Sequence, residues 1–203
     1  MLQAEAPPLI LASASTARRA VLAAAGLRFA VRPAAIDEAA IKAAARSEGL
    51  DATAAALRLA DAKADWVARQ EPQALVIGAD QILDCDGTWY DKPENLAAAR
   101  RQLLALRDRT HELATAVVCR TGYQARWQHV APPRLTMRAF SEAFLDAYLA
   151  AEGDRVLGSV GAYRLEGPGV QLFTCVDGDH ATILGLPLLP LLAFLRSAGV
   201  VRS

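Results

Sequence analysis

The sequence has no excess of either charge and no long apolar run. Its 203 residues contain 22 lysines and arginines against 22 aspartates and glutamates. Proteins that coat nucleic acid or lie on membrane surfaces normally show a basic excess, so this balance argues against both classes. No apolar stretch reaches the ~18 residues of a membrane span, and the first residues lack a signal-peptide pattern. We therefore expect a cytoplasmic protein without membrane or nucleic-acid partners.

Cysteine is also scarce, and its placement excludes a disulfide framework. The three residues are odd in number, widely spaced and set in apolar or strand-like runs: Cys85, Cys119 and Cys175. No pair has metal-ligand spacing, and the three histidines are too scattered for a zinc site. We expect small core thiols in a reducing compartment. A chain of this length folds without disulfides or a structural metal, and we predict one domain over residues 1–203.

Several nucleotide-binding signatures are missing, although strands and helices clearly alternate. The sequence has no Walker loop, no dinucleotide glycine fingerprint and no nucleophile elbow. Apolar periodicity predicts a strand starting at Leu9 and further strands at 29–32, 74–77 with a continuation at 82–83, 112–119, 127–137 and 170–176. It predicts helices at 15–26, 37–48, 51–70, 94–107, 141–151 and 188–198. Because hairpins interrupt the alternation, we predict an α/β fold with a mixed sheet.

Arg18 and Arg19 stand in the first turn of the first predicted helix. Ser15 is its natural N-cap and Gly26 its natural stop. A cation at a helix N-terminus is unfavourable by ~0.3–1 kcal/mol. An anion resting on the exposed N–H groups would reverse that sign, with serine hydroxyls completing a phosphate cradle. The alternative is that both arginines extend into solvent.

Lys63 and Asp80 are the next residues that do not fit a purely structural role. Lys63 lies in the middle of an apolar helix face, with Trp66 and Val67 among its neighbours. The Lys63 ammonium either reaches solvent because the aliphatic part of the side chain extends along the surface, or it points into a cleft. Asp80 follows a compact apolar strand, where α/β folds place ligands, although it would also cap a turn.

Lys92, in a predicted loop, and the carboxylates Asp37 and Glu38, at a predicted helix start, complete the set of candidate residues. Lys92 precedes Pro93 and is therefore extended, and on its own it fits a solvated loop. Asp37 and Glu38 fit a helix start as well as a metal site. Cations with serine donors suit a polyphosphate, and paired carboxylates suit a hard cation such as Mg²⁺. The candidate site residues are Ser13, Ser15, Arg18, Glu38, Lys63, Asp80 and Lys92.

These residues stand in runs that resemble the Maf family of nucleoside triphosphate pyrophosphatases over nearly the whole chain. The runs are Leu9–Arg18, Ile36-Asp37-Glu38, Ala62-Lys63-Ala64, Val76–Asp80, Lys92-Pro93, Thr110-His111-Glu112, Gly161-Ala162-Tyr163, Glu166-Gly167 and Gly185-Leu186-Pro187-Leu188. Each fragment alone is weak evidence. Nine fragments in the right order and spacing make the resemblance strong.

The resemblance implies a Maf-type α/β fold, a mixed twisted sheet with flanking helices and two lobes around a nucleotide cleft. It implies hydrolysis of a nucleoside triphosphate to monophosphate and pyrophosphate with Mg²⁺ or Mn²⁺, commonly by a homodimer. Asp80 then corresponds to the catalytic aspartate and, with Glu38, to the metal ligands. Arg18, Lys63 and Lys92 match catalytic cations. Ser13 and Ser15, with Arg18, match the phosphate-binding residues.

Three departures bear on the base that such an enzyme prefers. Thr16 and Ala17 replace the family's usual proline and arginine, Gln81 follows the aspartate in place of threonine, and Glu166 replaces glutamine. Gln81 and Glu166 resemble the subgroup of 7-methyl-GTP pyrophosphatases, not the subgroup preferring dTTP or UTP. A carboxylate accepts from the two adjacent donors of a guanine edge, and N7 methylation adds a positive charge. Glu166 in a glycine-rich loop also fits a solvent-facing residue.

We therefore predict a metal-dependent nucleoside triphosphate pyrophosphatase with a 7-methyl-GTP-like preference. One alternative is a dTTP/UTP-preferring enzyme of the same kind. Another is a nucleotide-binding regulator of septum formation with little catalysis, because the family name derives from an effect on septation. A nucleotidyltransferase would need an acceptor pocket and a glycine-rich nucleotide loop, which the sequence lacks.

Overall fold

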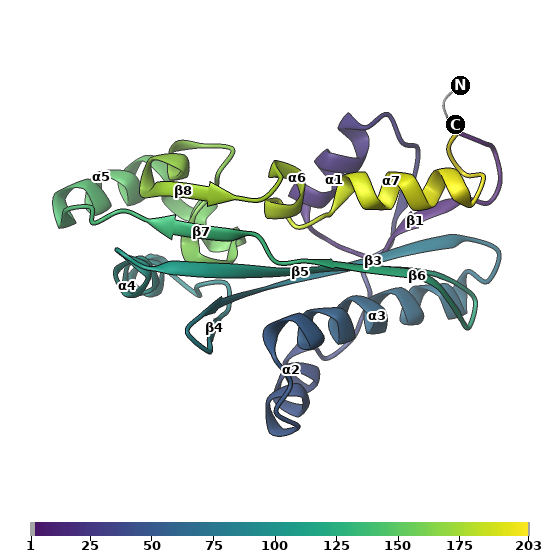
Figure 1. Cartoon of the computed structure of the whole chain (residues 1–203), viewed down its shortest axis with the longest axis horizontal. Helices are drawn as coiled ribbons and strands as arrows, with labels where there is room; N and C mark the ends of the chain where they lie inside the picture. The colour runs from purple at the N-terminus through teal and green to yellow at the C-terminus, as the bar shows by residue number, and fades with distance from the viewer. Residues whose placement is uncertain (1–2, 203) are drawn as a thin grey trace. The chain divides into compact units, whose positions relative to one another are not determined.

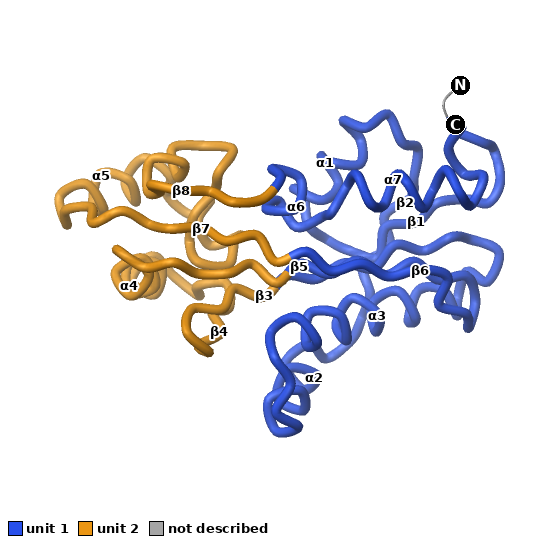
Figure 2. The backbone as a smooth tube through the Cα atoms, in the orientation of Figure 1, with its two compact units in different colours: residues 1–81, 115–131, 179–203 blue, residues 82–114, 132–178 orange. Residues whose placement is uncertain are grey.

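The computed structural model describes residues 3–202, which divide into two compact units (Figure 2). Unit 1 comprises residues 1–81, 115–131 and 179–203, and unit 2 comprises residues 82–114 and 132–178. Two long strands, β3 (Leu75–Cys85) and β5 (Thr110–Thr121), contribute residues to both units. The predicted cleft between two lobes and the single domain over 1–203 stay predictions.

In unit 1 the strand order is β2-β1-β3-β5-β6. Strands β1 (Leu9–Leu11) and β2 (Ala30–Val31) run parallel to each other, and β1 is also parallel to β3, with Leu11 opposite Ile77. Strand β6 (Gln124–Ala131) is antiparallel to β5. The sheet is therefore mixed, and the predicted α/β class with a mixed sheet and flanking helices is confirmed.

Helices of unit 1 begin where short polar side chains accept backbone N–H groups. Ser15 caps α1 (Thr16–Ala24), Asp37 caps α2 (Glu38–Ser47) and Asp51 caps α3 (Ala52–Gln70). Two further helices close the unit: α6 (His180–Ile183) and α7 (Leu188–Ser197). Each cap offsets one of the N–H groups that a helix start leaves without a partner.

The unit 1 sheet is covered on both faces, by α3 on one and by α1 and α7 on the other (Figure 1). Leu75, Ile77 and Ala79 pack in the core with Leu22 of α1 and Leu191 of α7. Because side chains alternate along a strand, the intervening residues of β3 face α3. At the closest approach a Cβ added to Gly78 would lie 2.2 Å from the Ala60 carbonyl oxygen. Only glycine lets α3 lie this close to β3.

Unit 2 is built on an antiparallel set of strands ordered β4-β3-β5-β7-β8. It adds β4 (Thr88–Tyr90), β7 (Arg134–Met137) and β8 (Phe173–Asp177), and antiparallel registers join β4 to β3, β7 to β5 and β8 to β7. Helices α4 (Leu96–Leu106) and α5 (Glu142–Glu152) pack with three 3₁₀ turns, η1 (Gly153–Gly158), η2 (Val160–Ala162) and η3 (Pro168–Leu172).

The element predictions hold for most of the chain, and the structure differs from them in several places. Strand β4 lies outside the predicted ranges, and the predicted strand at 127–137 is two strands, β6 and β7. Strand β3 continues through Asp80 without a break, because it goes on to pair with β4. Helix α4 starts two residues late, since Asn95 accepts the Ala98 N–H. Residues 170–172 belong to η3, and α6 was not predicted. Cys175 is exposed on β8, so the prediction of a core thiol was wrong there.

Between residues 3 and 202, none of the helices combines the length and the apolar character needed to cross a bilayer.

Candidate active site

The parallel register of β1 and β3 brings the first serine toward the aspartate. Strand β1 ends at Leu11, opposite Ile77, and Ser13 follows it by two residues, while β3 continues to Asp80 three residues beyond Ile77. Both Ser13 and Asp80 are buried, with exposed fractions of 7% and 5%. Asp80 is therefore an interior residue of β3 and not the cap of a turn.

Lys63 lies between two carboxylates of unit 1. Its Nζ donates to Asp80 Oδ1 at 2.5 Å and lies 2.9 Å from Glu38 Oε2. The Lys63 and Asp80 side chains are under 10% exposed, whereas Glu38 is about half exposed. The lysine therefore does not extend to solvent: its ammonium is buried and paired. Removing Lys63 would leave the buried Asp80 carboxylate without its paired cation.

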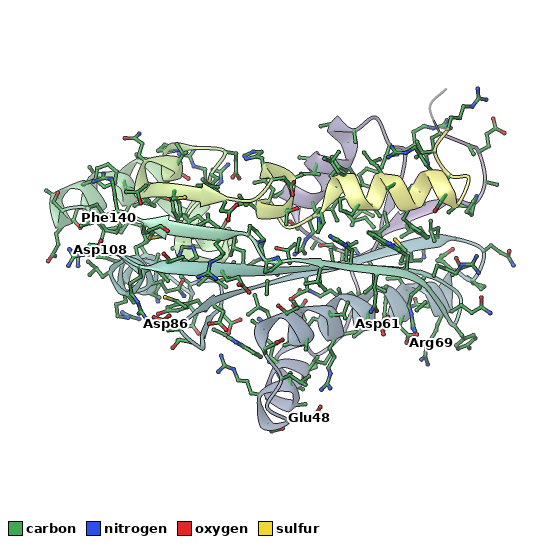
Figure 3. All side chains as sticks on the ribbon, viewed as in Figure 1. Glu48, Asp61, Arg69, Asp86, Asp108 and Phe140 are labelled. Atoms are coloured by element: carbon green, nitrogen blue, oxygen red, sulfur yellow. The ribbon has the colours of Figure 1, made fainter. Side chains whose placement is uncertain are left out.

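Glu38 reaches this lysine because α2 packs against α3. It is the first residue of α2, where a carboxylate also interacts favourably with the helix dipole. At the other end of α2, Glu48 accepts both Nη atoms of Arg58 on α3, at 2.9 and 2.6 Å. Figure 3 labels Glu48 at this end of the helix. The fork is thus a further contact between α2 and α3, at the end of α2 away from Glu38.

The guanidinium of Arg18 is half-buried and fixed at two of its nitrogens. Nε donates to the Gly185 carbonyl oxygen at 2.8 Å, and Nη1 donates to Ser13 Oγ at 3.2 Å. Burial lowers the pKa of Arg18, and the nearby charges of Asp80 and Glu38 oppose that shift. Arg18 therefore does not extend into solvent, and it shares the electrostatic field of the two carboxylates. Its neighbour Arg19 is exposed.

The two serines shape the start of α1 in a nested arrangement. Ser13 Oγ accepts the Ser15 N–H at 3.2 Å, and Ser15 Oγ accepts the Arg18 N–H at 3.3 Å. The first helical backbone bond runs from the Arg19 N–H to the Ser15 carbonyl. The N–H groups of Thr16 and Ala17 precede that bond, at the positive end of the helix dipole.

Gln81 ties β3 to β5 and to the end of α6. Its Nε2 donates to Thr115 Oγ1 at 2.8 Å and approaches the carbonyl oxygens of Thr182 and Ile183 at 3.3 and 3.2 Å. The chain then turns at Gly185, whose carbonyl holds Arg18. These contacts give Gln81 a part in positioning that turn.

The other two predicted residues, Lys92 and Glu166, lie in unit 2, and their approach to the unit 1 group stays a prediction. Lys92 is exposed in the loop after β4. Glu166 is about one-third exposed, and its Oε1 accepts from Arg164 Nε at 3.1 Å. Glu166 is therefore exposed, as the solvent-facing alternative expects, and at the same time paired with Arg164.

The donor set fits a hard divalent ion. Asp80 and Glu38 each place one carboxylate oxygen within 2.9 Å of the same ammonium, so both oxygens reach one cationic centre. Mg²⁺ is typically held by one or two carboxylates together with substrate phosphates. Within residues 3–202 the structure has no cluster of three or more His, Cys, Asp or Glu side chains suited to a metal ion.

The groups that hold these side chains could not be recognised from the sequence patterns. Gly78 permits the close contact of α3 with β3, and Gly185 supplies the acceptor for Arg18. Thr115 holds Gln81, and Arg164 holds Glu166. Gly185 stands in one of the runs quoted above, but nothing in that run signals that its carbonyl meets a side chain 167 residues away.

Comparisons with known proteins identify the family of this chain. A protein from Granulibacter bethesdensis named nucleoside triphosphate pyrophosphatase is 54% identical, over 93% of this chain and 95% of its own. One of the same name from Paramagnetospirillum magneticum is 53% identical, over 94% and 98%. A protein from Rhizobium meliloti named 7-methyl-GTP pyrophosphatase is 47% identical, over 97% and 99%. The model of the Maf-like protein family matches residues 8–198. The chain therefore belongs to the Maf-like protein family.

Proposed function

We propose that this protein is a divalent-metal-dependent pyrophosphatase that cleaves nucleoside triphosphates into a monophosphate and pyrophosphate. The observation that carries the proposal is the buried ammonium of Lys63 between Asp80 and Glu38, with Arg18 in the same field. Two carboxylates beside a buried ammonium and a half-buried guanidinium suit a metal–polyphosphate pair. The names of the relatives from Granulibacter and Rhizobium support the same reaction class.

In this proposal Asp80 and Glu38 hold the ion. When bound there, it supplies Lewis acidity and positive charge to the phosphate oxygens. Asp80 orients or deprotonates the attacking water. The water oxygen forms the new bond to phosphorus, and the bond between the α- and β-phosphates breaks. Electrostatic stabilisation and positioning provide most of the rate enhancement.

The cations and serines bind and neutralise the triphosphate. Arg18, fixed by Ser13 and Gly185, is presented without the loss of side-chain freedom that an exposed arginine would suffer on binding. Ser15, Lys63 and Lys92 complete the phosphate contacts, and both units then serve one catalytic domain, which we expect to form a homodimer.

For the base, we propose a preference for 7-methyl-GTP over UTP and dTTP. Glu166 supports this, because a carboxylate accepts from adjacent donors, whereas a pyrimidine edge would set an acceptor against it. An unpaired buried polar group costs roughly 1–3 kcal/mol, about tenfold or more in selectivity. Ala17 and Gln81 belong to the same specificity set, although Gln81 Nε2 is already engaged by Thr115.

The test is a pyrophosphate-release assay with Mg²⁺ or Mn²⁺ over a panel of 7-methyl-GTP, GTP, UTP and dTTP. We expect release that stops on chelation and falls at least ~100-fold in Asp80→Asn. Asp146→Asn, an exposed carboxylate paired with Arg100, is the matched control and keeps its activity. Nucleotide binding without release would contradict the enzyme and favour a regulator. Release with UTP or dTTP as the best substrate would contradict only the base preference.

A further inference from the structure

Glu166 stands at the exposed end of a chain of three charged side chains in unit 2. Arg164 Nε donates to Glu166 Oε1 at 3.1 Å, and Arg164 Nη1 donates to Glu152 Oε2 at 3.3 Å. The exposed fraction of the side chain rises from 1% for Glu152 to 26% for Arg164 and 35% for Glu166. A buried anion thus holds the guanidinium that holds Glu166.

Position 152 is energetically unfavourable for a carboxylate, so the groups that pair with Glu152 have to offset that cost. Glu152 is the last residue of α5, where the helix dipole disfavours negative charge. Its carboxylate is buried, and Arg155 Nη2 lies 3.4 Å from Oε1 in addition to the contact with Arg164. Arg155 also donates to the carbonyl oxygens of Ala151 and Glu152. Arg155 therefore binds the C-terminal end of α5, whereas Arg164 contacts both Glu152 and Glu166.

The backbone around Arg164 is closed tightly enough to fix its position. A Cβ added to Gly169 would lie 2.5 Å from the Arg164 carbonyl oxygen, and one added to Gly167 would lie 3.4 Å from Glu152 Oε1. Just before this loop, Ala162 has a left-handed backbone with φ of 59°, and its carbonyl accepts from Tyr148 Oη at 3.2 Å. The segment is thus closely packed on the Arg164 backbone at Gly169, and Gly167 lies beside the buried carboxylate.

We propose that Arg164 is a positioning residue for base selection: it fixes which atom of the side chain at position 166 is presented to the nucleotide base. The proposal rests on the proposed function, in which Glu166 contacts the base. The planar guanidinium suits this task because its N–H groups point in fixed directions at two carboxylates at once. A lysine has a single nitrogen on a flexible stem and does not reproduce that fork.

The consequence is clearest for an amide at position 166. Arg164 Nε needs an acceptor, so in Glu166→Gln the amide oxygen turns toward Arg164 and the NH₂ group takes the place of Glu166 Oε2. The presented atom changes from an acceptor to a donor. An acceptor favours the N–H donors of a guanine edge, and a donor favours a pyrimidine carbonyl. Without Arg164 the amide rotates and presents either atom.

The experiment measures kcat and KM for 7-methyl-GTP and UTP in wild type, Glu166→Gln, Arg164→Met and the double variant. We expect Glu166→Gln to lower the kcat/KM ratio of 7-methyl-GTP to UTP by about tenfold or more where Arg164 is present. In the Arg164→Met background we expect the same change to lower it by less than about threefold. The difference should lie mainly in KM, because the chemistry at the phosphates is untouched.

Two outcomes would contradict the proposal, and the kcat/KM ratios in the two backgrounds distinguish them. If Glu166→Gln changes the ratio equally in both backgrounds, Glu166 reads the base without help from Arg164. If Glu166→Gln changes the ratio in neither background, the base-reading role of Glu166 in the proposed function fails as well. Arg155→Met is the matched control: it removes a cation from Glu152 without touching Glu166, so the tenfold effect should persist.

A second set of variants tests whether a loss of stability in Arg164→Met explains the result. If Arg164→Met leaves Glu152 uncompensated and lowers the melting temperature, the pair Glu152→Gln with Arg164→Met removes both charges together and keeps the net charge. Replacing both members of a buried ion pair is often neutral for stability. Glu166→Gln is then introduced into wild type and into the variant carrying Glu152→Gln and Arg164→Met. We expect it to lower the kcat/KM ratio of 7-methyl-GTP to UTP by about tenfold or more in wild type, and by less than about threefold in that variant.

Discussion

Lys63 Nζ and Asp80 Oδ1 lie 2.5 Å apart in the interior of unit 1, and the two residues come from different elements, α3 and β3. Each side chain is under 10% exposed, so neither charge is compensated by water. The glycine at position 78 is what allows α3 to approach β3 closely enough for this contact. The stability of the fold and the proposed chemistry therefore depend on the same ion pair.

Lys63→Met should destabilise the protein more than its change in volume suggests. The substitution leaves the Asp80 carboxylate buried without its cation, a loss of about 3–5 kcal/mol in the free energy of unfolding. Lys63→Met with Asp80→Asn removes both charges and should cost clearly less than the two single changes added together. Urea unfolding of the four proteins measures this coupling. Additive effects would show that the pair does not interact in the folded state.

Gly78→Ala should lower both stability and activity, since its Cβ would lie 2.2 Å from the Ala60 carbonyl oxygen and 2.7 Å from the Ala64 nitrogen. Helix α3 has to shift, and overpacking of this kind costs about 1–3 kcal/mol. The shift also moves Lys63 away from Asp80, so pyrophosphate release should fall. Gly158→Ala, where a Cβ meets nothing within 4 Å, is the control. Equal melting temperatures for the two variants would contradict the close packing.

Gly185→Ala should weaken substrate handling through Arg18. An added Cβ would lie 3.0 Å from Arg18 Nε, and φ at this position is +97°. The strained backbone and the contact together displace the carbonyl that accepts from Arg18. Gly199→Ala also has a left-handed φ, +71°, but open space around its Cβ. We expect a several-fold rise in KM for the nucleotide in Gly185→Ala only. Matching KM values would mean that Arg18 does not depend on this contact.

His111 should make stability fall in acid. Its Nε2 is 2.8 Å from Tyr163 Oη, and burial lowers the pKa of His111 from 6.5 to about 4. Between these values the unfolded chain binds a proton that the folded protein does not, so the free energy of unfolding decreases as pH falls from 6.5 to 4. The decrease from this group is at most about 3 kcal/mol.

The check for His111 is a series of urea titrations between pH 4 and pH 7 on wild type and His111→Gln. The glutamine keeps a group that can contact Tyr163 but has no titrating proton. Wild type should lose stability more steeply than the variant over this range. Parallel curves would contradict the lowered pKa.

Much of this molecule could be predicted from the sequence because the signals are local. Ser15, Asp51 and Ser141 cap helices where the sequence places them. The Asp-Gly pair at positions 86 and 87, a dipeptide typical of hairpin turns, joins β3 to β4 with both residues at positive φ. These elements depend on propensity, capping and side-chain periodicity within a few residues.

The sequence by itself thus determined the elements, the α/β class and the set of charged residues that stand out from the apolar pattern. Only the tertiary structure decided which of them meet. Lys63 finds Asp80 across 17 residues, and Arg18 finds the Gly185 carbonyl across 167. Such contacts are fixed by the register of β1 on β3 and by the depth at which α3 packs. No local pattern encodes them, because burial and close approach depend on residues far away in the chain.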